Sequence, residues 1–197
     1  MTTLNLQVGA NTDDAREHTG FDGCATDNLK SGAVSGTYYA GARFTGANIP
    51  SGATIDICVT KWTERFWDGG SHTNTVLFQD DTPNPATFGC SGNSPKDRVD
   101  GALVTSNSAA WAFTEGGPDA EHTSPSLVTP LQEAVDDAGG LDEIVLILDG
   151  TGASEYKPWF GYEQSTTKAP KLDVTYTAGA GPSGPPAGSL ALLGVGA

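Results

Sequence analysis

Hydrophobic and polar residues alternate in two stretches of this chain, one near the N-terminus and one near residue 175. Leu4, Leu6 and Val8 occupy every second position near the N-terminus, and Lys171–Thr177 alternates in the same way. A period of two places the apolar side chains on one face of an extended backbone. Both stretches are therefore predicted to be half-buried β-strands.

A third alternating stretch, Ala53–Trp62, follows a turn sequence. Its residues Ile55, Ile57 and Val59 are expected to share the buried face of a strand. The preceding Pro-Ser-Gly sequence ends at Gly52, and glycine permits the positive φ of a tight turn. The pattern therefore predicts a turn followed by a long strand.

An uninterrupted apolar run, Glu143–Asp149, predicts a central strand that is buried on both faces. The polar stretch Gly9–Gly36 is expected to contain a short strand or two, and loops are predicted at Asp80–Pro85 and Ser91–Asp97. Further short strands are predicted at Tyr38–Thr45, Thr75–Gln79, Ala86–Phe88, Ala102–Thr105, Ala110–Phe113 and Trp159–Glu163.

One helix is predicted, at Ser126–Ala138, where apolar residues recur at helical spacing and form a single stripe. We expect Ser124 to cap its N-terminus, Pro125 to occupy its first turn and Gly139 to end it.

Composition agrees with a β-rich fold. Gly (26) and Pro (12) together make 38 of 197 residues, and both favour turns between short strands. The sequence therefore predicts an all-β fold, an antiparallel jelly-roll β-sandwich with one short helix at about 126–138 and an extended C-terminal arm. The expected organisation is a sandwich at 1–177, a Gly/Pro linker at 178–188 and an apolar docking arm at 189–197.

The C-terminal arm is apolar and uncharged, with no charged residue from Val174 onwards. Exposing one of its large side chains to water costs about 1.5–3 kcal/mol relative to burial. We expect the arm to pack against another subunit, although a terminal tail without a role is the alternative. The predicted interface residues are Leu190, Leu192, Leu193 and Val195.

The net charge is −14, from 10 basic and 24 acidic residues. Such a charge repels nucleic-acid phosphates and anionic lipid surfaces, so neither is an expected partner. The N-terminus has no basic segment followed by an apolar one, so no secretory signal is predicted. No apolar run is long enough to span a bilayer.

The three cysteines, Cys24, Cys58 and Cys90, cannot all pair within one chain, and none has the spacing of a zinc or redox motif. The sequence favours three buried thiols. A single Cys24–Cys90 or Cys58–Cys90 disulfide remains open.

No catalytic motif is present, and the three histidines lie in polar segments that are expected to be loops. The chain is therefore predicted not to be an enzyme and to need no cofactor. Asp13–Asp14 and Asp80–Asp81 are expected to be solvated turn acids, with a structural calcium ion at Asp13 or Asp14 as the alternative.

Trp62 and Trp67 flank a charged turn, Thr63–Arg65, where their rings could be exposed. Exposed tryptophans stack on sugar rings, so this pair is the candidate glycan-binding site. Burial in the core is the competing interpretation.

Three segments carry a resemblance to a known family. They are the opening strand with Asp13-Asp14-Ala15, the run Gly41–Ile55 (Gly-Ala-Arg-Phe-Thr-Gly-Ala-Asn-Ile-Pro-Ser-Gly-Ala-Thr-Ile), and the closing Lys168–Tyr176. Their order resembles the DNRLRE (disaggregatase-related, carbohydrate-binding-module-like) sandwich domains. The family's namesake motif is not present, so the resemblance implies a fold and no ligand site. Such domains occur in surface and secreted proteins and in phage structural proteins.

The function expected from these features is that of a non-enzymatic virion structural protein, either a capsid decoration or a tail-associated protein at the virion surface. Its expected partners are other virion proteins and copies of itself. The alternative is a carbohydrate-binding module that recognises surface glycans.

Overall fold

The computed structural model describes residues 1–20, 24–25, 28–66, 71–113 and 116–179. Fourteen strands and two helices are assigned within them. The strands are β1 (Thr2–Gln7), β2 (Asp14–His18), β3 (Cys24–Ala25), β4 (Lys30–Ala33), β5 (Thr37–Phe44), β6 (Ile49–Pro50), β7 (Thr54–Thr63), β8 (His72–Phe78), β9 (Ala109–Phe113), β10 (Glu121–Thr123), β11 (Gly140–Leu141), β12 (Ile144–Asp149), β13 (Tyr156–Pro158) and β14 (Lys171–Thr177); the helices are α1 (Pro95–Asp100) and α2 (Val128–Ala138).

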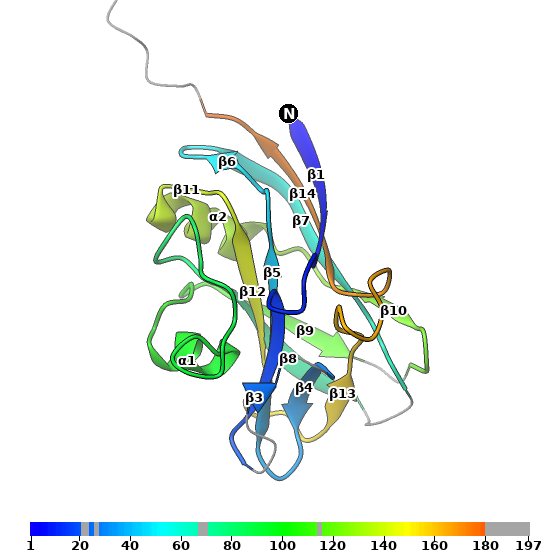
Figure 1. Cartoon of the computed structure of the whole chain (residues 1–197). Coiled ribbons are helices and arrows are strands. Elements are labelled where there is room, and N and C mark those ends of the chain that lie inside the picture. Colours follow the sequence, from blue (N-terminus) through cyan, green and yellow to red (C-terminus); the bar gives the residue numbers. More distant parts are fainter. Residues whose placement is uncertain (21–23, 26–27, 67–70, 114–115, 180–197) are drawn as a thin grey trace, which may run out of the picture.

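The chain forms an all-β sandwich with the strand order of a jelly roll (Figure 1). One sheet has the order β1-β14-β7-β10, and the other contains the run β5-β12-β8-β9. When these eight strands are numbered one to eight along the chain, the sheets read one-eight-three-six and two-seven-four-five. This is the double Greek key of a jelly roll, and every pairing is antiparallel.

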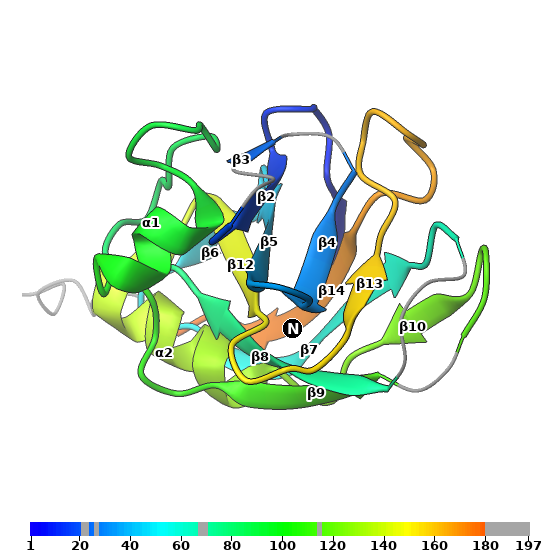
Figure 2. The same cartoon turned by 90° about the horizontal axis from the view of Figure 1, so that it is seen from below.

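The remaining strands extend the second sheet, and both helices lie at the same side of the sandwich (Figure 2). β4 and β13 continue the sheet beside β5, while β2 pairs with β5 and with the two-residue β3. The short β6 and β11 pair with each other next to α2.

β12 explains the uninterrupted apolar run of the sequence. Ile144, Leu146 and Leu148 point into the main core between the two sheets. Val145 and Ile147 point to the opposite face and pack with a second, smaller cluster that includes Phe88 and Ala15. The prediction of a central strand buried on both faces is confirmed.

In β7 the predicted face is only half correct. Ile55 is buried as expected, but Ile57 is 53% exposed and Cys58 is buried instead. The pairing with β14 shifts register here, because Tyr176 lies opposite Ile55 while Thr175 lies opposite Ile57. The extra residue of this β-bulge exchanges the two faces of the strand.

The two helices differ from the prediction in number and in their starting points. α2 begins at Val128, its N-cap is Leu127 without a side-chain hydrogen bond, and Ser124 and Pro125 therefore lie before it. Gly139 ends it with a positive φ of 73°, as predicted. α1 lies partly within a segment predicted to be a loop. Its N-cap Ser94 makes a reciprocal capping box with Asp97.

Several short segments also differ from the prediction. Ala86–Phe88 forms no strand, and Ala102–Thr105 contributes only the isolated bridge of Val104 to Gln79. Trp159–Glu163 is replaced by β13, which ends one residue earlier at Pro158, with Trp159 in an isolated bridge to Glu64. The polar stretch Gly9–Gly36 contains three short strands, β2, β3 and β4.

Candidate functional site

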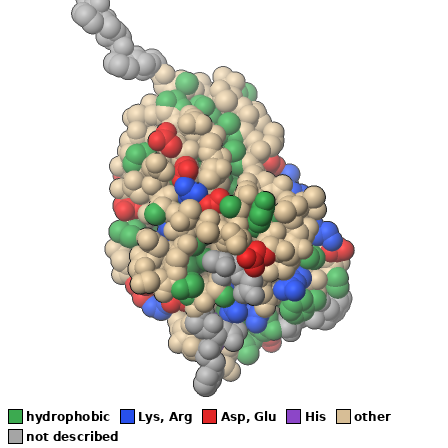
Figure 3. Space-filling view, in the orientation of Figure 1, with side chains coloured by type: hydrophobic (Ala, Val, Ile, Leu, Met, Phe, Trp, Pro, Cys, Tyr) green, Lys and Arg blue, Asp and Glu red, His purple; other side chains and the backbone are tan. Residues whose placement is uncertain are grey.

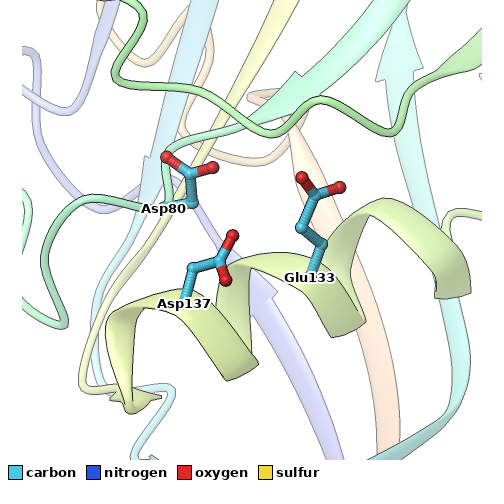
Figure 4. A group of neighbouring side chains, drawn as sticks. All are labelled: Asp80, Glu133 and Asp137. Atoms are coloured by element: carbon cyan, nitrogen blue, oxygen red, sulfur yellow. The ribbon is translucent and has the colours of Figure 1, made fainter.

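Three acidic side chains meet beside α2. Glu133 and Asp137 lie one turn apart on the same face of the helix, and Asp80 follows the end of β8. One carboxylate oxygen from each of the three lies within 4.8 Å of the other two. Figure 4 shows Glu133 and Asp137 rising from the helix towards Asp80 on the neighbouring loop.

The three carboxylates have different environments. Burial raises the pKa of Asp80, and the nearby charges of Asp137 and Glu133 raise it further. Burial alone would also raise the pKa of Glu133. Hydrogen bonds outweigh that effect and lower it, because Ser106 and Asn107 donate to both of its carboxylate oxygens.

A shallow groove of about 430 Å³ runs along the same face of α2. It is lined by Asn107, Val128, Thr129, Gln132, Glu133, Asp136 and Asp137. Oxygen-rich groups of this kind suit hard cations such as Ca²⁺, which takes six to eight oxygen ligands. The fit is poor, since the Glu133 oxygens already accept hydrogen bonds from Ser106 and Asn107. We assign no cation to this group.

The other acidic pair of the sequence, Asp13–Asp14, is buried, so the interpretation as solvated turn acids is wrong for it. Asp13 accepts from Arg43 Nη1 at 2.6 Å, and Arg43 also binds Glu143. The negative charge of Asp13 is therefore balanced by the Arg43 guanidinium, whereas the prediction had it surrounded by solvent.

Asp14 is fully buried and forms no ion pair with a described basic side chain. Its Oδ2 accepts from the backbone N–H of Tyr162 at 2.7 Å, while its Oδ1 has no hydrogen-bond partner. Burial raises the pKa of Asp14 to about 7, with smaller contributions from the charges of Glu163 and Asp13 and an opposing one from the Tyr162 hydrogen bond.

The predicted calcium site at Asp13 or Asp14 stays a prediction. The two carboxylates do not join a third acidic side chain within ligand distance among the described residues.

Trp62 is fully buried, so the candidate glycan platform is wrong at this residue and the competing interpretation, burial in the core, is confirmed. Its indole Nε1 donates to Thr60 Oγ1 at 2.9 Å, and its ring meets that of Trp159 edge to face at 5.9 Å. Even-numbered residues of β7 after the bulge point inwards, which carries the Trp62 ring into the core and away from any sugar. Trp67 lies outside the described residues, and its glycan-binding role stays a prediction.

A buried ionic group includes a residue of the predicted charged turn, Thr63–Arg65. Glu64 is 1% exposed and binds both Lys157 Nζ at 3.2 Å and His122 Nε2 at 3.1 Å. Lys157 is also 1% exposed. Each buried charge therefore has a partner, which is the condition under which burial is tolerated.

The histidines do not lie in loops as predicted. His18, His72 and His122 belong to β2, β8 and β10. His72 and His122 both contact the ring of Phe113. Their placement is that of core side chains.

Cys24 and Cys90 form a disulfide, and Cys58 is a free, buried thiol. The preference for three thiols is wrong, and one of the two open pairings is the correct one. The bond joins β3 to the loop before α1.

The predicted interface residues, Leu190, Leu192, Leu193 and Val195, lie outside the described residues and remain predictions.

Part of this geometry was accessible from the sequence. Glu133 and Asp137 are four residues apart in a predicted helix, so their common face could have been read from the spacing. The contacts of Asp80 with that helix and of Glu64 with Lys157 join residues far apart in the chain. They depend on how the strands pair.

No protein-family model matches this chain, and no curated protein matches it in sequence.

Proposed function

We propose that this chain is a non-enzymatic structural protein of a virus particle, a capsid decoration or tail-associated protein at the virion surface, anchored through residues 189–197. The observation that carries the proposal is that the described residues form a sandwich with a core of their own. Among the described residues, the main core cluster runs from Val8 to Tyr176. The proposal assigns the apolar side chains of the arm to a neighbouring protein.

The point at which the chain leaves the sandwich supports this role. β14 ends at Thr177, and Gly179 then lies against the backbone of Gly52, so that a Cβ at position 179 would come within 2.3 Å of the Gly52 oxygen. This exit is at the end of the molecule where β1 begins (Figure 1). The linker thus departs from one end of a closed unit, which suits an anchor.

The disulfide supports a location outside a reducing cytosol, because such bonds persist in oxidising surroundings. The acidic exterior favours solubility at the high local density of a particle surface. On the face shown in Figure 3, acidic and basic side chains stand among uncharged ones, and hydrophobic side chains are scattered. No helix of the described residues is long and apolar enough to cross a membrane.

The test is to purify particles from cells that produce them with either the full chain or a chain lacking Ser189–Ala197. We expect the full chain to band with the particles in a density gradient and the truncated chain to be reduced at least tenfold. A Leu190→Asp, Leu193→Asp variant should behave like the truncation, and Ser189→Ala, the matched control, like the full chain. Unchanged thermal unfolding would show that the sandwich is intact.

Two outcomes would contradict the proposal. If the full chain never bands with particles, the virion role is wrong. If the truncated chain decorates particles at full occupancy, the arm is not the anchor.

A carbohydrate-binding module is the second candidate, and one observation favours it. Phe66 is 37% exposed at the end of the described segment that precedes Trp67, with the guanidinium of Arg65 over its ring at 5.7 Å. An aromatic ring of this kind can stack on a sugar. Glycan-array binding that is lost in Phe66→Ala and in Trp67→Ala would favour this candidate, and an array without signal would exclude it.

A further inference from the structure

Among the described residues, β1 is an edge strand of the first sheet. This six-residue strand pairs with β14 on one side, and no described strand pairs with its other side. Val8, the next residue, donates its N–H to Pro170 O at 3.0 Å, on the β14 side. Because the direction of backbone groups alternates along an antiparallel strand, the N–H and C=O groups of Thr3, Asn5 and Gln7 point to the open side.

The open side of β1 lacks the features that normally block edge-to-edge pairing. Its sequence, Thr-Thr-Leu-Asn-Leu-Gln, contains neither a charge nor a proline, and its register with β14 is regular. The opposite edge of the same sheet, β10, has only three residues and begins with Glu121. β13, at an edge of the second sheet, is equally short and ends in Pro158.

β9 is also an uncharged edge strand, but it lies in the second sheet. β1, by contrast, is the direct neighbour of the strand from which the chain leaves. Thr2 pairs with Tyr176, one residue before the end of β14. The open edge and the origin of the C-terminal segment therefore lie together.

The linker is long enough to carry the arm to another molecule. Residues 178–188 contain Pro182, Pro185 and Pro186, and such linkers extend by about 3.1 Å per residue, or roughly 34 Å over this range. Crossing β1 of the same chain requires only two strand spacings, roughly 10 Å. The surplus length allows the arm to reach a neighbouring molecule.

The chemistry of the arm and of the edge is compatible. Neither has a charged side chain, so their side chains add no local repulsion between molecules that each carry −14. Leu4 and Leu6 are only partly buried at the border of the core. Leu190 and Leu192 are two residues apart, and in an extended segment both side chains would fall on one face.

We propose that the arm of one copy adds as a strand to the open edge of β1 in a second copy. Its apolar residues then cover Leu4 and Leu6, and its backbone binds the outward groups of Thr3, Asn5 and Gln7. This inference rests on the proposed function, since it gives the arm a specific acceptor. It makes the assembly self-complementary, with an arm and an acceptor in every copy.

The test measures self-association by sedimentation equilibrium of the full chain and its variants. Asn5→Pro removes one outward N–H and leaves the β14 ladder intact, whereas Asn5→Ala, the matched control, keeps that N–H. We expect Asn5→Pro to weaken association at least tenfold and Asn5→Ala to change it less than twofold. A Leu190→Asp, Leu192→Asp variant lies outside the sandwich and should give the same loss without affecting its folding.

Amide hydrogen exchange supplies the second readout. In the associated full chain, the amides of Thr3, Asn5 and Gln7 should exchange at least tenfold more slowly than in the chain without residues 189–197. The amides of Leu4 and Leu6, which face β14, should change little.

The failures are distinguishable. Association that needs the arm but survives Asn5→Pro, with free exchange at Thr3 and Asn5, would overturn the β1 acceptor and leave the docking arm in place. Protection that is independent of protein concentration would show that the arm binds its own β1 and would overturn the second copy as occupant. A chain that stays monomeric at all concentrations would overturn the inference, while particle attachment would still test the proposed function separately.

Discussion

At the scale of single residues, Asp14 shows how a buried carboxyl group connects stability with pH. Its folded-state pKa of about 7 lies above the ordinary value of 3.8 because the side chain is removed from solvent. Between these two values the folded state holds a proton that the unfolded state has released. The contribution of Asp14 to stability therefore falls as the pH rises through this window and is lowest above pH 7.

The substitution Asp14→Asn tests this argument, because asparagine resembles the protonated side chain and can still accept the hydrogen bond from Tyr162. We expect it to stabilise the protein relative to the wild type, with a gain that grows by about 2–3 kcal/mol from pH 5 to pH 8. Urea unfolding at a series of pH values measures the difference. Asp142→Asn is the matched control, since it removes the same charge from an exposed side chain. A gain at pH 8 no larger than at pH 5 would contradict the assignment.

At the scale of elements, the disulfide fixes a region that has little regular structure of its own. β3 contains two residues, and Cys24 within it is joined to Cys90 at a sequence separation of 66. Closing a loop of this size in the unfolded chain contributes roughly 4 kcal/mol in the chain-entropy description. The bond thus compensates for the short strand to which it is attached.

Reduction of the wild type, or the double substitution Cys24→Ser, Cys90→Ser, is expected to lower the free energy of unfolding by about 3–4 kcal/mol. Thermal unfolding with and without dithiothreitol measures it, and the double variant should not respond to the reductant. Burial raises the pKa of the Cys58 thiol, so native alkylation should leave that cysteine unmodified. If reduction left the unfolding temperature of the wild type unchanged, the stabilising role of the bond would be wrong.

The elements also show which parts of the fold local sequence determines. β12 and β14 are correctly predicted because their patterns follow from burial on two faces and on one. The bulge in β7 has no local signal, and it exchanges Ile57 for Cys58 on the inner face. The missed helix α1 did have a signal, since Ser94, Pro95 and Asp97 occupy the capping positions of a helix start.

The candidate site also contains residues that local sequence places and residues that only the tertiary fold brings together. The spacing of Glu133 and Asp137 follows from one helix, whereas Asp80 reaches them only because β8 ends beside that helix. The sequence left the exposure of Trp62 open because the side on which it lies depends on the phase of β7 after the bulge. The burial of Glu64 has no local signal, because its partner Lys157 is 93 residues away.

At the scale of the whole molecule, the dominant property is the net charge of −14, which opposes any association between copies. The proposed contact between the arm and β1 contains no charge, so it cannot offset this repulsion by ion pairing. Added salt shortens the range of repulsion, from about 30 Å at 0.01 M to about 10 Å at 0.1 M ionic strength. An interface held by apolar contacts and backbone hydrogen bonds should therefore become stronger in salt.

We expect the dissociation constant for self-association at pH 7.5 to fall roughly tenfold between low and moderate ionic strength, because the repulsion is screened while the contacts are not. Sedimentation equilibrium across a NaCl series measures this change. Asn5→Pro is the control. If the salt response reports the β1 contact and not general precipitation, this variant should abolish it. Ion pairs at an interface would give the opposite sign, since salt weakens them. Dissociation on adding salt would therefore mean that another, charged surface joins the copies, and the uncharged edge of β1 would lose its role as acceptor.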